Sequence, residues 1–166
     1  PVVLGATHSV GTFDFVARGG TNGADGLAFV FQPGANGVSA IGGVGWQIGI
    51  PTEQSVAIVF DTYQNAIDPS ANQLMVVLDG DVENPLARVD LTGHFDLNDG
   101  RVHTAWIDYD GMDDRLEVFL TADGSKPDNP TLTTTLDFAA LFGDCLRVGF
   151  SAATGANLPI KNGLFI

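Results

Sequence analysis

Two carboxylates and a carboxamide lie close together directly after an apolar run of the sequence. The run ends at position 60, and Asp61, Asn65 and Asp68 follow within eight positions, with Tyr63 between the first two. In an extended chain residues 61, 63 and 65 point to one side. The side-chain oxygens of Asp61 and Asn65 can therefore converge while the Tyr63 carbonyl turns towards them. Such an all-oxygen set suits calcium, which would also offset the repulsion between the carboxylates.

This stretch is not an EF-hand loop. Counted from Asp61, the positions that require Gly and Glu in an EF-hand hold Ala66 and Asn72. Asn and Asp are also ordinary turn-forming residues. On spacing alone, an acidic turn that binds no metal is therefore the simpler interpretation.

Two further stretches contain glycines beside groups that can contact a ligand. Asp25 precedes an apolar strand, where its carboxylate can accept hydrogen bonds from ligand hydroxyls. Gly42, Gly43 and Gly45 allow close backbone approach, and Trp46 beside them offers a flat apolar face. Taken alone, each stretch is more simply a turn.

The sequence contains no recognisable catalytic set. The histidines lack the spacing of metal ligands, and no two glutamates lie close on one predicted strand face, as paired glycosidase carboxylates would. A Gly-x-Ser-x-Gly nucleophile motif is absent. The residues concerned are His8, His94, His103, Glu53, Glu83 and Glu117. We therefore expect no enzyme activity, and a sandwich-fold glycoside hydrolase is disfavoured.

The composition excludes several classes of partner. The 166 residues carry a formal charge of −13, from 20 acidic and 7 basic side chains. Nucleic acids and anionic membrane surfaces require clustered Lys and Arg, and no run approaches the roughly 20 apolar residues of a membrane span. We expect neither nucleic acid binding nor membrane insertion. The acidity fits a calcium-rich or saline medium outside the cell, or simple solubility.

The elements that must position these residues are predominantly strands. Apolar residues recur with a period of two, and 21 glycines supply breaks between the runs. One short helix is predicted over 138–142, capped by Asp137 and ended by Gly143. The pattern predicts one all-β domain over residues 1–166, an antiparallel β-sandwich. The predicted strands are 10–16, 27–31, 56–60, 74–78, 88–91, 102–109, 115–120, 131–136, 146–152 and 160–166.

Several motifs in order along the chain resemble the legume-lectin-like (L-type) lectin domain. They are ADGLAFVFQP (24–33), GGVGWQIGI (42–50), VAIVFDTYQN (56–65), HTAWIDYD (103–110) and VGFSAATG (148–155). The resemblance covers nearly the whole chain from Val10 onward and extends to bacterial members, so we expect a bacterial member of the family. It implies a concanavalin A-like jelly roll of two antiparallel sheets, with loops at one end that bind sugar.

The resemblance also implies a metal site. The family binds calcium through residues that correspond to Asp61, Asn65, Asp68 and the Tyr63 carbonyl. It commonly places a transition metal beside the calcium, held in part by a Glu and a His. Those two positions correspond to Val59 and Gln73 here, so we expect calcium alone.

The family's sugar site transfers to a second set of residues. The resemblance assigns Asp25, after a cis peptide bond from Ala24, together with Asn65 and the loop residues Ala156 and Asn157. A glycine N–H donor corresponds to Gly43, or to Gly42 if the register shifts by one. The aromatic floor of the pocket falls to Tyr63 or Trp46, or to the short loop near Ile67.

These implications give the expected function. We expect a calcium-dependent carbohydrate-binding domain, secreted or on a cell surface, within an adhesive protein. Because single-site sugar affinity is weak, an oligomer or a multivalent parent protein would raise it. The alternative is a structural or adhesive module whose sugar site has degenerated.

Overall fold

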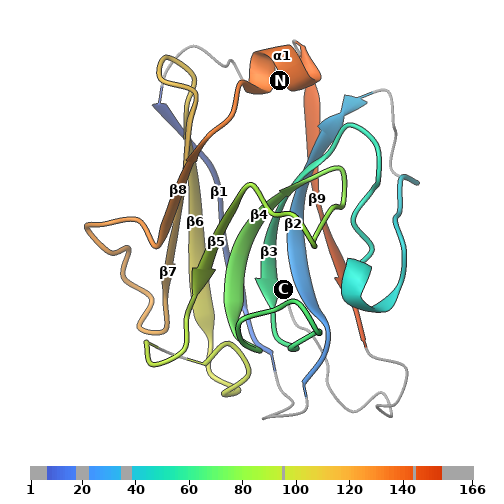
Figure 1. The fold of residues 1–166 in the computed structure, drawn as a ribbon. Coiled ribbons are helices and arrows are strands. Elements are labelled where there is room, and N and C mark those ends of the chain that lie inside the picture. Colours follow the sequence, from blue (N-terminus) through green and yellow to red (C-terminus); the bar gives the residue numbers. More distant parts are fainter. Residues whose placement is uncertain (1–6, 18–22, 35–38, 95, 144, 155–166) are drawn as a thin grey trace.

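The protein is described by a computed structural model, which covers residues 7–17, 23–34, 39–94, 96–143 and 145–154. Two antiparallel sheets pack face to face (Figure 1). One sheet has the order β1-β6-β7-β8, with bounds Thr7–Phe15, His103–Asp110, Arg115–Thr121 and Leu132–Thr135. The other has the order β5-β4-β3-β2-β9, with bounds Ala87–Asp90, Gln73–Leu78, Val56–Asp61, Gly26–Pro33 and Leu146–Ala153. The predicted all-β sandwich is confirmed, while the strand predicted over 160–166 lies outside the described residues.

The five-stranded sheet is apolar on both faces because both faces are covered. Alternate residues of β3, such as Ile58, pack into the core between the sheets. Their neighbours, such as Val59, pack against Ile48 and Ile50 from the segment that crosses the outer face. All six residues of β3 are buried as a result. The continuous apolar runs of the sequence therefore correspond to strands covered on two sides.

The single helix, α1 (Phe138–Phe142), begins and ends where its caps predict. Asp137 Oδ1 accepts a hydrogen bond of 2.8 Å from the Ala140 N–H. Gly143 ends the helix with φ at 65°, a conformation that favours glycine. The helix lies at one end of the sandwich (Figure 1).

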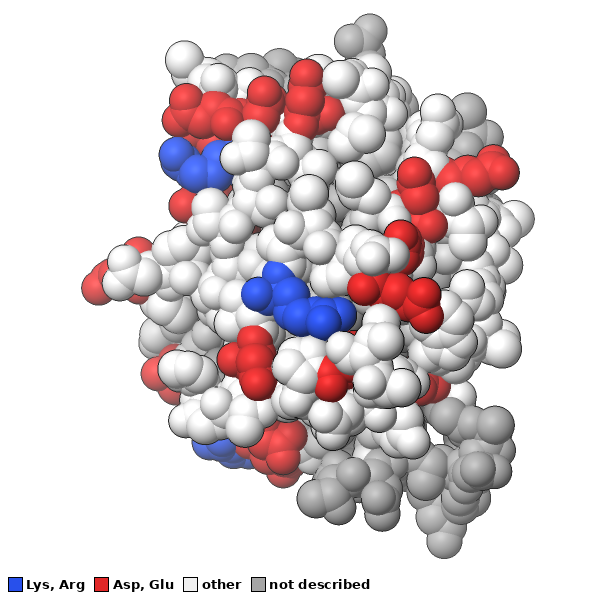
Figure 2. Space-filling view, viewed as in Figure 1, with Lys and Arg blue, Asp and Glu red and all other residues white. Residues whose placement is uncertain are grey.

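The opposite end carries the loops that hold the candidate site (Figure 1). Gly26 at the start of β2 pairs with Asp61 at the end of β3, so the loops before 26 and after 61 meet there. Acidic side chains are spread over the face seen in Figure 2, whereas Lys and Arg are few. Within the described residues, no helix combines the length and apolar character needed to cross a bilayer.

Candidate metal and sugar site

Asp61 is the most buried carboxylate of the candidate site. It ends β3, and only 3% of its surface is exposed. One carboxylate oxygen, Oδ1, accepts a 3.0 Å hydrogen bond from the Tyr63 N–H. The sequence places an ionisable group here because the strand leaves the core at this residue, so Asp61 faces a loop while it remains largely out of water.

The loop after β3 folds its remaining acceptors towards Asp61. The Asn65 N–H donates to Asp68 Oδ2 at 2.8 Å, and the Asp68 N–H donates to the Asn65 carbonyl at 3.1 Å. Gln64 stabilises the turn from outside, because its side-chain Nε2 donates a hydrogen bond of 3.0 Å to the Asp68 carbonyl. Asp61, Asn65 and Asp68 thereby line one cavity of about 330 Å³. Three of the four predicted calcium ligands are thus brought together.

Tyr63, the fourth predicted ligand, contacts Asp61 through its main-chain N–H. The Tyr63 N–H fixes the Asp61 carboxylate, while its ring is 44% exposed. Trp46, in the 3-10 turn η3 (Gly45–Gln47), lines the same cavity. Of the two aromatic residues proposed for the pocket floor, Trp46 is therefore the one that lines this cavity, where it is 43% exposed.

The electrostatics of this cluster favour a bound cation. Burial, the largest cause, and the nearby Asp68 and Asp25 carboxylates raise the pKa of Asp61, and the net result of all influences is a pKa of about 7. The hydrogen bond from Tyr63 and the charge of Arg88 act in the opposite direction. A second positive charge close to Asp61 would stabilise its ionised form.

Asp25 lies beside this cluster on a backbone held from two sides. The Ala24–Asp25 peptide bond is cis, as the resemblance predicts. The Asp25 N–H donates to the Ala153 carbonyl at 2.7 Å, and its carbonyl accepts from the Thr62 N–H at 3.0 Å. The side chain is buried, its Oδ2 has no hydrogen-bond partner among the described residues, and burial raises its pKa. A buried acceptor of this kind requires a donor from outside the chain.

Gly45, from the same glycine run as the predicted Gly43, lies beside the Asp25 carboxylate. A Cβ atom built on Gly45 would lie 3.9 Å from Asp25 Oδ2, so Gly45 passes alongside the carboxylate. Gly43 turns its carbonyl to the Gly49 N–H at 2.8 Å, and a Cβ there would clash with Gln47. The φ angle of Gly45 is 65°, a left-handed conformation that favours glycine.

Two predicted residues are not described, and one residue that was not predicted lines the cavity. Ala156 and Asn157 lie outside the described residues. Glu83 lines the cavity with Asp61 and Asp68, although sequence reasoning did not assign it to the site. Glu83 is distant from Asp61 and Asp68 in the sequence and lies near them only in the folded chain, so no local sequence motif indicates it.

The two positions where the family commonly has transition-metal ligands hold residues that coordinate such a metal poorly. Val59 has no donor atom, and Gln73 supplies an oxygen, Oε1, that is buried without a partner. Arg88 occupies this side of the cluster: its Nη2 lies 3.5 Å from Asp68 Oδ1, and its Nε lies 3.4 Å from the Met75 sulfur. In the part of the chain that the structure describes, no group of three or more His, Cys, Asp or Glu is arranged to hold a metal. The donor set therefore suits calcium with added water or ligand oxygens, and calcium alone stays a prediction.

Comparison with known families identifies this arrangement. The sequence model described as "Legume lectin domain" matches residues 9–162. The chain belongs to the legume lectin domain family. The match covers both sheets and every described residue of the candidate site, so the chain is a lectin module.

Relatives come from plants. The chain is 32% identical over 143 residues to the L-type lectin-domain containing receptor kinase VIII.2 of Arabidopsis thaliana, covering 82% of this chain and 20% of that protein. It is 31% identical over 151 residues to Lectin 1 of Medicago truncatula, covering 87% of this chain and 52% of the relative. The expectation of a bacterial member of the family is therefore not supported. The chain spans about half of Lectin 1 and a fifth of the kinase.

Solved structures agree with the fold. Basic winged bean lectin with Tn-antigen superposes with a TM-score of 0.71 at 28% identity, over 87% of this chain and 60% of that one. Winged bean acidic lectin complexed with methyl-α-D-galactose gives a TM-score of 0.70 at 27% identity, over 88% and 61%. Both are similar to this chain across its two sheets, which confirms the concanavalin A-like sandwich.

Proposed function

We propose that the chain is a calcium-dependent carbohydrate-binding domain that holds its sugar without turnover. The observation that carries the proposal is the buried Asp25 Oδ2, which has no partner in the protein and lies beside the Asp61 and Asp68 carboxylates. A hydroxyl-rich ligand supplies the missing donors, and a divalent cation compensates the clustered charge.

Calcium would be held by the Asp61 and Asp68 carboxylates, the Asn65 side-chain oxygen and the Tyr63 carbonyl. When bound, the ion supplies positive charge to a cluster in which Arg88 is the nearby cation among the described residues. The mutual hydrogen bonds of Asn65 and Asp68 already fold the loop, so little ordering remains when the ion binds. Such pre-organisation favours affinity in a shallow site.

The sugar would be fixed by an acceptor and several donors from distant segments. Asp25 accepts hydrogen bonds from sugar hydroxyls, while Asn65 donates through its amide. A backbone N–H comes from Gly43, as the family resemblance predicts, or from the neighbouring Gly45. Further donors come from Ala156 and Asn157 by the same resemblance. The winged bean lectin structures, which contain methyl-α-D-galactose and Tn-antigen, support the sugar class of ligand.

The setting follows from the same function. We infer an extracellular location, secreted or at a cell surface, because calcium is abundant there and the similar Arabidopsis proteins are receptor kinases with an L-type lectin domain. A single shallow site gives weak affinity, so an oligomer or a larger adhesive protein would supply avidity. The relatives' kinase activity lies in parts that the present chain does not cover.

A glycan array tests the proposal directly. The wild-type chain is applied in excess calcium and again in chelator, next to the Asp25→Ala variant in calcium. The proposal expects glycan signals in calcium that chelator and the variant abolish. If the folded wild-type chain binds no glycan in saturating calcium, a structural or adhesive module with a degenerate site is the better account.

A further inference from the structure

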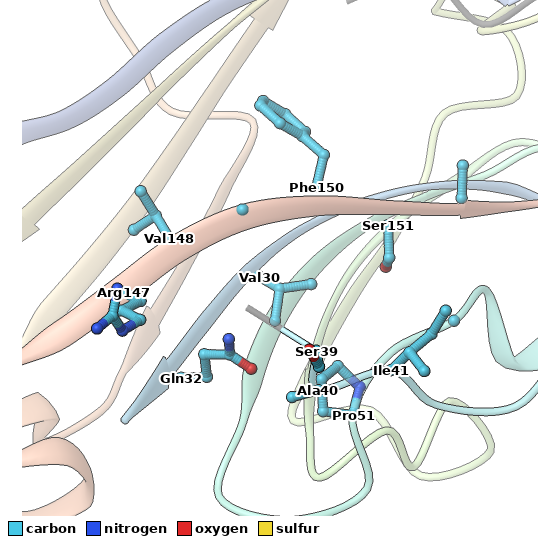
Figure 3. A pocket seen from close by; sticks show the side chains of 13 residues that line it. Val30, Gln32, Ser39, Ala40, Ile41, Pro51, Arg147, Val148, Phe150 and Ser151 are labelled. Carbon is cyan, nitrogen blue, oxygen red and sulfur yellow. The ribbon is translucent and has the colours of Figure 1, made fainter. Parts of the chain in front are cut away.

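A second cavity lies on the outer face of the five-stranded sheet. It encloses about 730 Å³ between β2 and β9 on one side and the segments at 39–41 and 49–51 on the other (Figure 3). It shares no lining residue with the cavity beside Asp61. The family's sugar and calcium residues therefore do not account for it.

The alternation of β9 gives this cavity two different ends. Arg147, Gly149 and Ser151 share one face of the strand, whereas Val148 and Phe150 project from the other (Figure 3). Ser151 lies four positions after Arg147, so their Cα atoms are about 13 Å apart along the strand. A guanidinium thus lies at one end of the cavity and a hydroxyl at the other. Between them Gly149 leaves the floor open, because a Cβ built there would meet no atom within 4 Å.

Arg147 is an unneutralised cation in a strongly acidic protein. Its Nε donates to the Gly34 carbonyl at 3.2 Å, which orients the guanidinium and leaves both terminal nitrogens available. Among the described residues that line the cavity, none is Asp or Glu. Among the described residues, every other Lys or Arg lies within ion-pair distance of a carboxylate: Arg88, Arg101, Arg115 and Lys126.

The rest of the lining is mixed: Val30, Ile41 and Pro51 are apolar, whereas Gln32, Ser39 and Ser151 are polar. Val30 forms the floor beside Gly149, and Ile41 and Pro51 face it across the cavity. Ile41 is 80% exposed, an unusual state for a large apolar side chain next to a pocket of this size. Ser151 Oγ is inaccessible to water and has no hydrogen-bond partner in the protein. Apolar walls with a few convergent polar groups are typical of small-molecule sites.

We propose that this cavity binds a small organic carboxylate with an apolar body and a polar far end. The carboxylate pairs with the terminal nitrogens of Arg147, a geometry that the planar guanidinium matches. The apolar body lies over Val30 and Gly149 and against Ile41. The polar end lies next to Ser151, which lines the far end of the cavity.

The probe is 6-hydroxyhexanoate, whose carboxylate and hydroxyl are separated by five methylenes. Amide chemical shifts of the isotope-labelled chain are followed during titration, with 1,6-hexanediol as the uncharged control. The expected result is a saturable shift of amides in β9 and around Ile41, with a Kd on the order of 1 mM. Hexanediol is expected to bind about tenfold more weakly, and added salt should weaken the acid alone.

Two variants and a matched control locate the site. Arg147→Gln removes the charge of an exposed side chain and should remove the preference for the acid over the diol. Gly149→Leu adds a side chain whose Cβ would meet no protein atom within 4 Å, and it should block both probes. Arg101→Gln changes an arginine that is outside the cavity and paired with Asp99, and should change nothing. Wild-type spectra that do not respond to the acid, or an Arg147→Gln variant that binds it as wild type does, would overturn the proposal.

Discussion

The two ends of the sandwich bury polar groups in opposite ways. At the helix end, the Tyr109 hydroxyl lies 3.0 Å from Asp114 Oδ1, 3.0 Å from the Leu136 carbonyl and 3.1 Å from the Phe138 N–H. Its ring stacks on Phe138 with centroids 4.3 Å apart. At the loop end, Asp25 Oδ2 has no partner, and the buried Asp61 lies near two other carboxylates.

The two ends therefore differ in whether their buried polar groups are paired within the chain. A buried polar group that is fully paired within the chain stabilises one conformation. A buried group that lacks a partner lowers stability until something supplies the missing contact. The Tyr109 hydroxyl is fully paired within the chain, whereas under the proposed function a cation and a hydrogen-bonding ligand would complete the Asp25 and Asp61 end.

The largest expected effect comes from Asp61→Asn at the loop end. The amide keeps an acceptor for the Tyr63 N–H but loses the charge, so calcium binding should be lost. At a calcium concentration 100 times the Kd, the wild type gains about 2.7 kcal/mol, which raises the melting temperature by roughly 5–10 °C. The variant should show none of this rise in calorimetric scans with calcium and with chelator.

The matched control is Asp128→Asn, which changes an exposed acid far from the site in sequence. It should keep the full calcium-dependent rise. A calcium response in Asp61→Asn equal to that of the control would mean that the ion binds elsewhere.

At the other end, Tyr109→Phe should destabilise the fold by about 1–3 kcal/mol, because the Leu136 carbonyl and the Phe138 N–H lose their partner. Urea unfolding measures this cost. The calcium-dependent rise in melting temperature should remain that of the wild type, since the two ends act independently. A reduced calcium response in this variant would show that the ends are coupled.

A smaller effect is expected from Arg88→Gln. Arg88 is the cation next to Asp68, and its side chain is 23% exposed. Its removal should lower the stability of the calcium-free protein by about 1 kcal/mol or less, because the carboxylates then repel each other more strongly. Calcium should bind more tightly, since the ion no longer competes with the guanidinium. Calcium titration that shows unchanged or weaker affinity would contradict this role.

The smallest effect concerns pH and His103, the first residue of β6. Burial lowers the pKa of His103 below 6.5, against the opposing influence of Asp99, whose Oδ1 is 3.2 Å from Nε2. Below pH 6.5 the unfolded chain takes up a proton that the folded chain resists, so stability should fall as pH is lowered through this range. Arg101 and Asp96, which also act on His103, oppose each other.

Urea unfolding of the wild type and of His103→Gln, both in saturating calcium, isolates this contribution. The wild type should lose stability relative to the variant as the pH falls from 7.5 to 5.5. Parallel pH profiles for the two proteins would assign the dependence to other groups.

Much of the fold was predictable because its signals are local. Alternation located the strands, Asp137 and Gly143 marked the helix ends, and the acidic turn at 110–114 marked the hairpin between β6 and β7. The apolar run at 56–60 indicated a strand covered on both faces, but not what covers it. Ile48 and Ile50, which cover it, come from a segment without regular periodicity.

The site was predictable only where one stretch of chain contains it. Asp61, Asn65 and Asp68 share a loop, and their convergence followed from spacing. Arg88 and Glu83 arrive from the far side of β4, and no local pattern connects them to that loop. The position of Gly45 beside Asp25 depends on a left-handed backbone angle, which a run of several glycines does not locate.

The most direct test of the central claim is titration calorimetry of Asp25→Ala and the wild type, in saturating calcium, against the strongest glycan from the array. Asp25 is the unpaired acceptor, and its loss leaves sugar hydroxyls without a partner. The account predicts a loss of about 1.5–3 kcal/mol, or roughly 10- to 100-fold in affinity, with calcium binding retained. Equal glycan affinity in the two proteins would contradict it and place the sugar elsewhere.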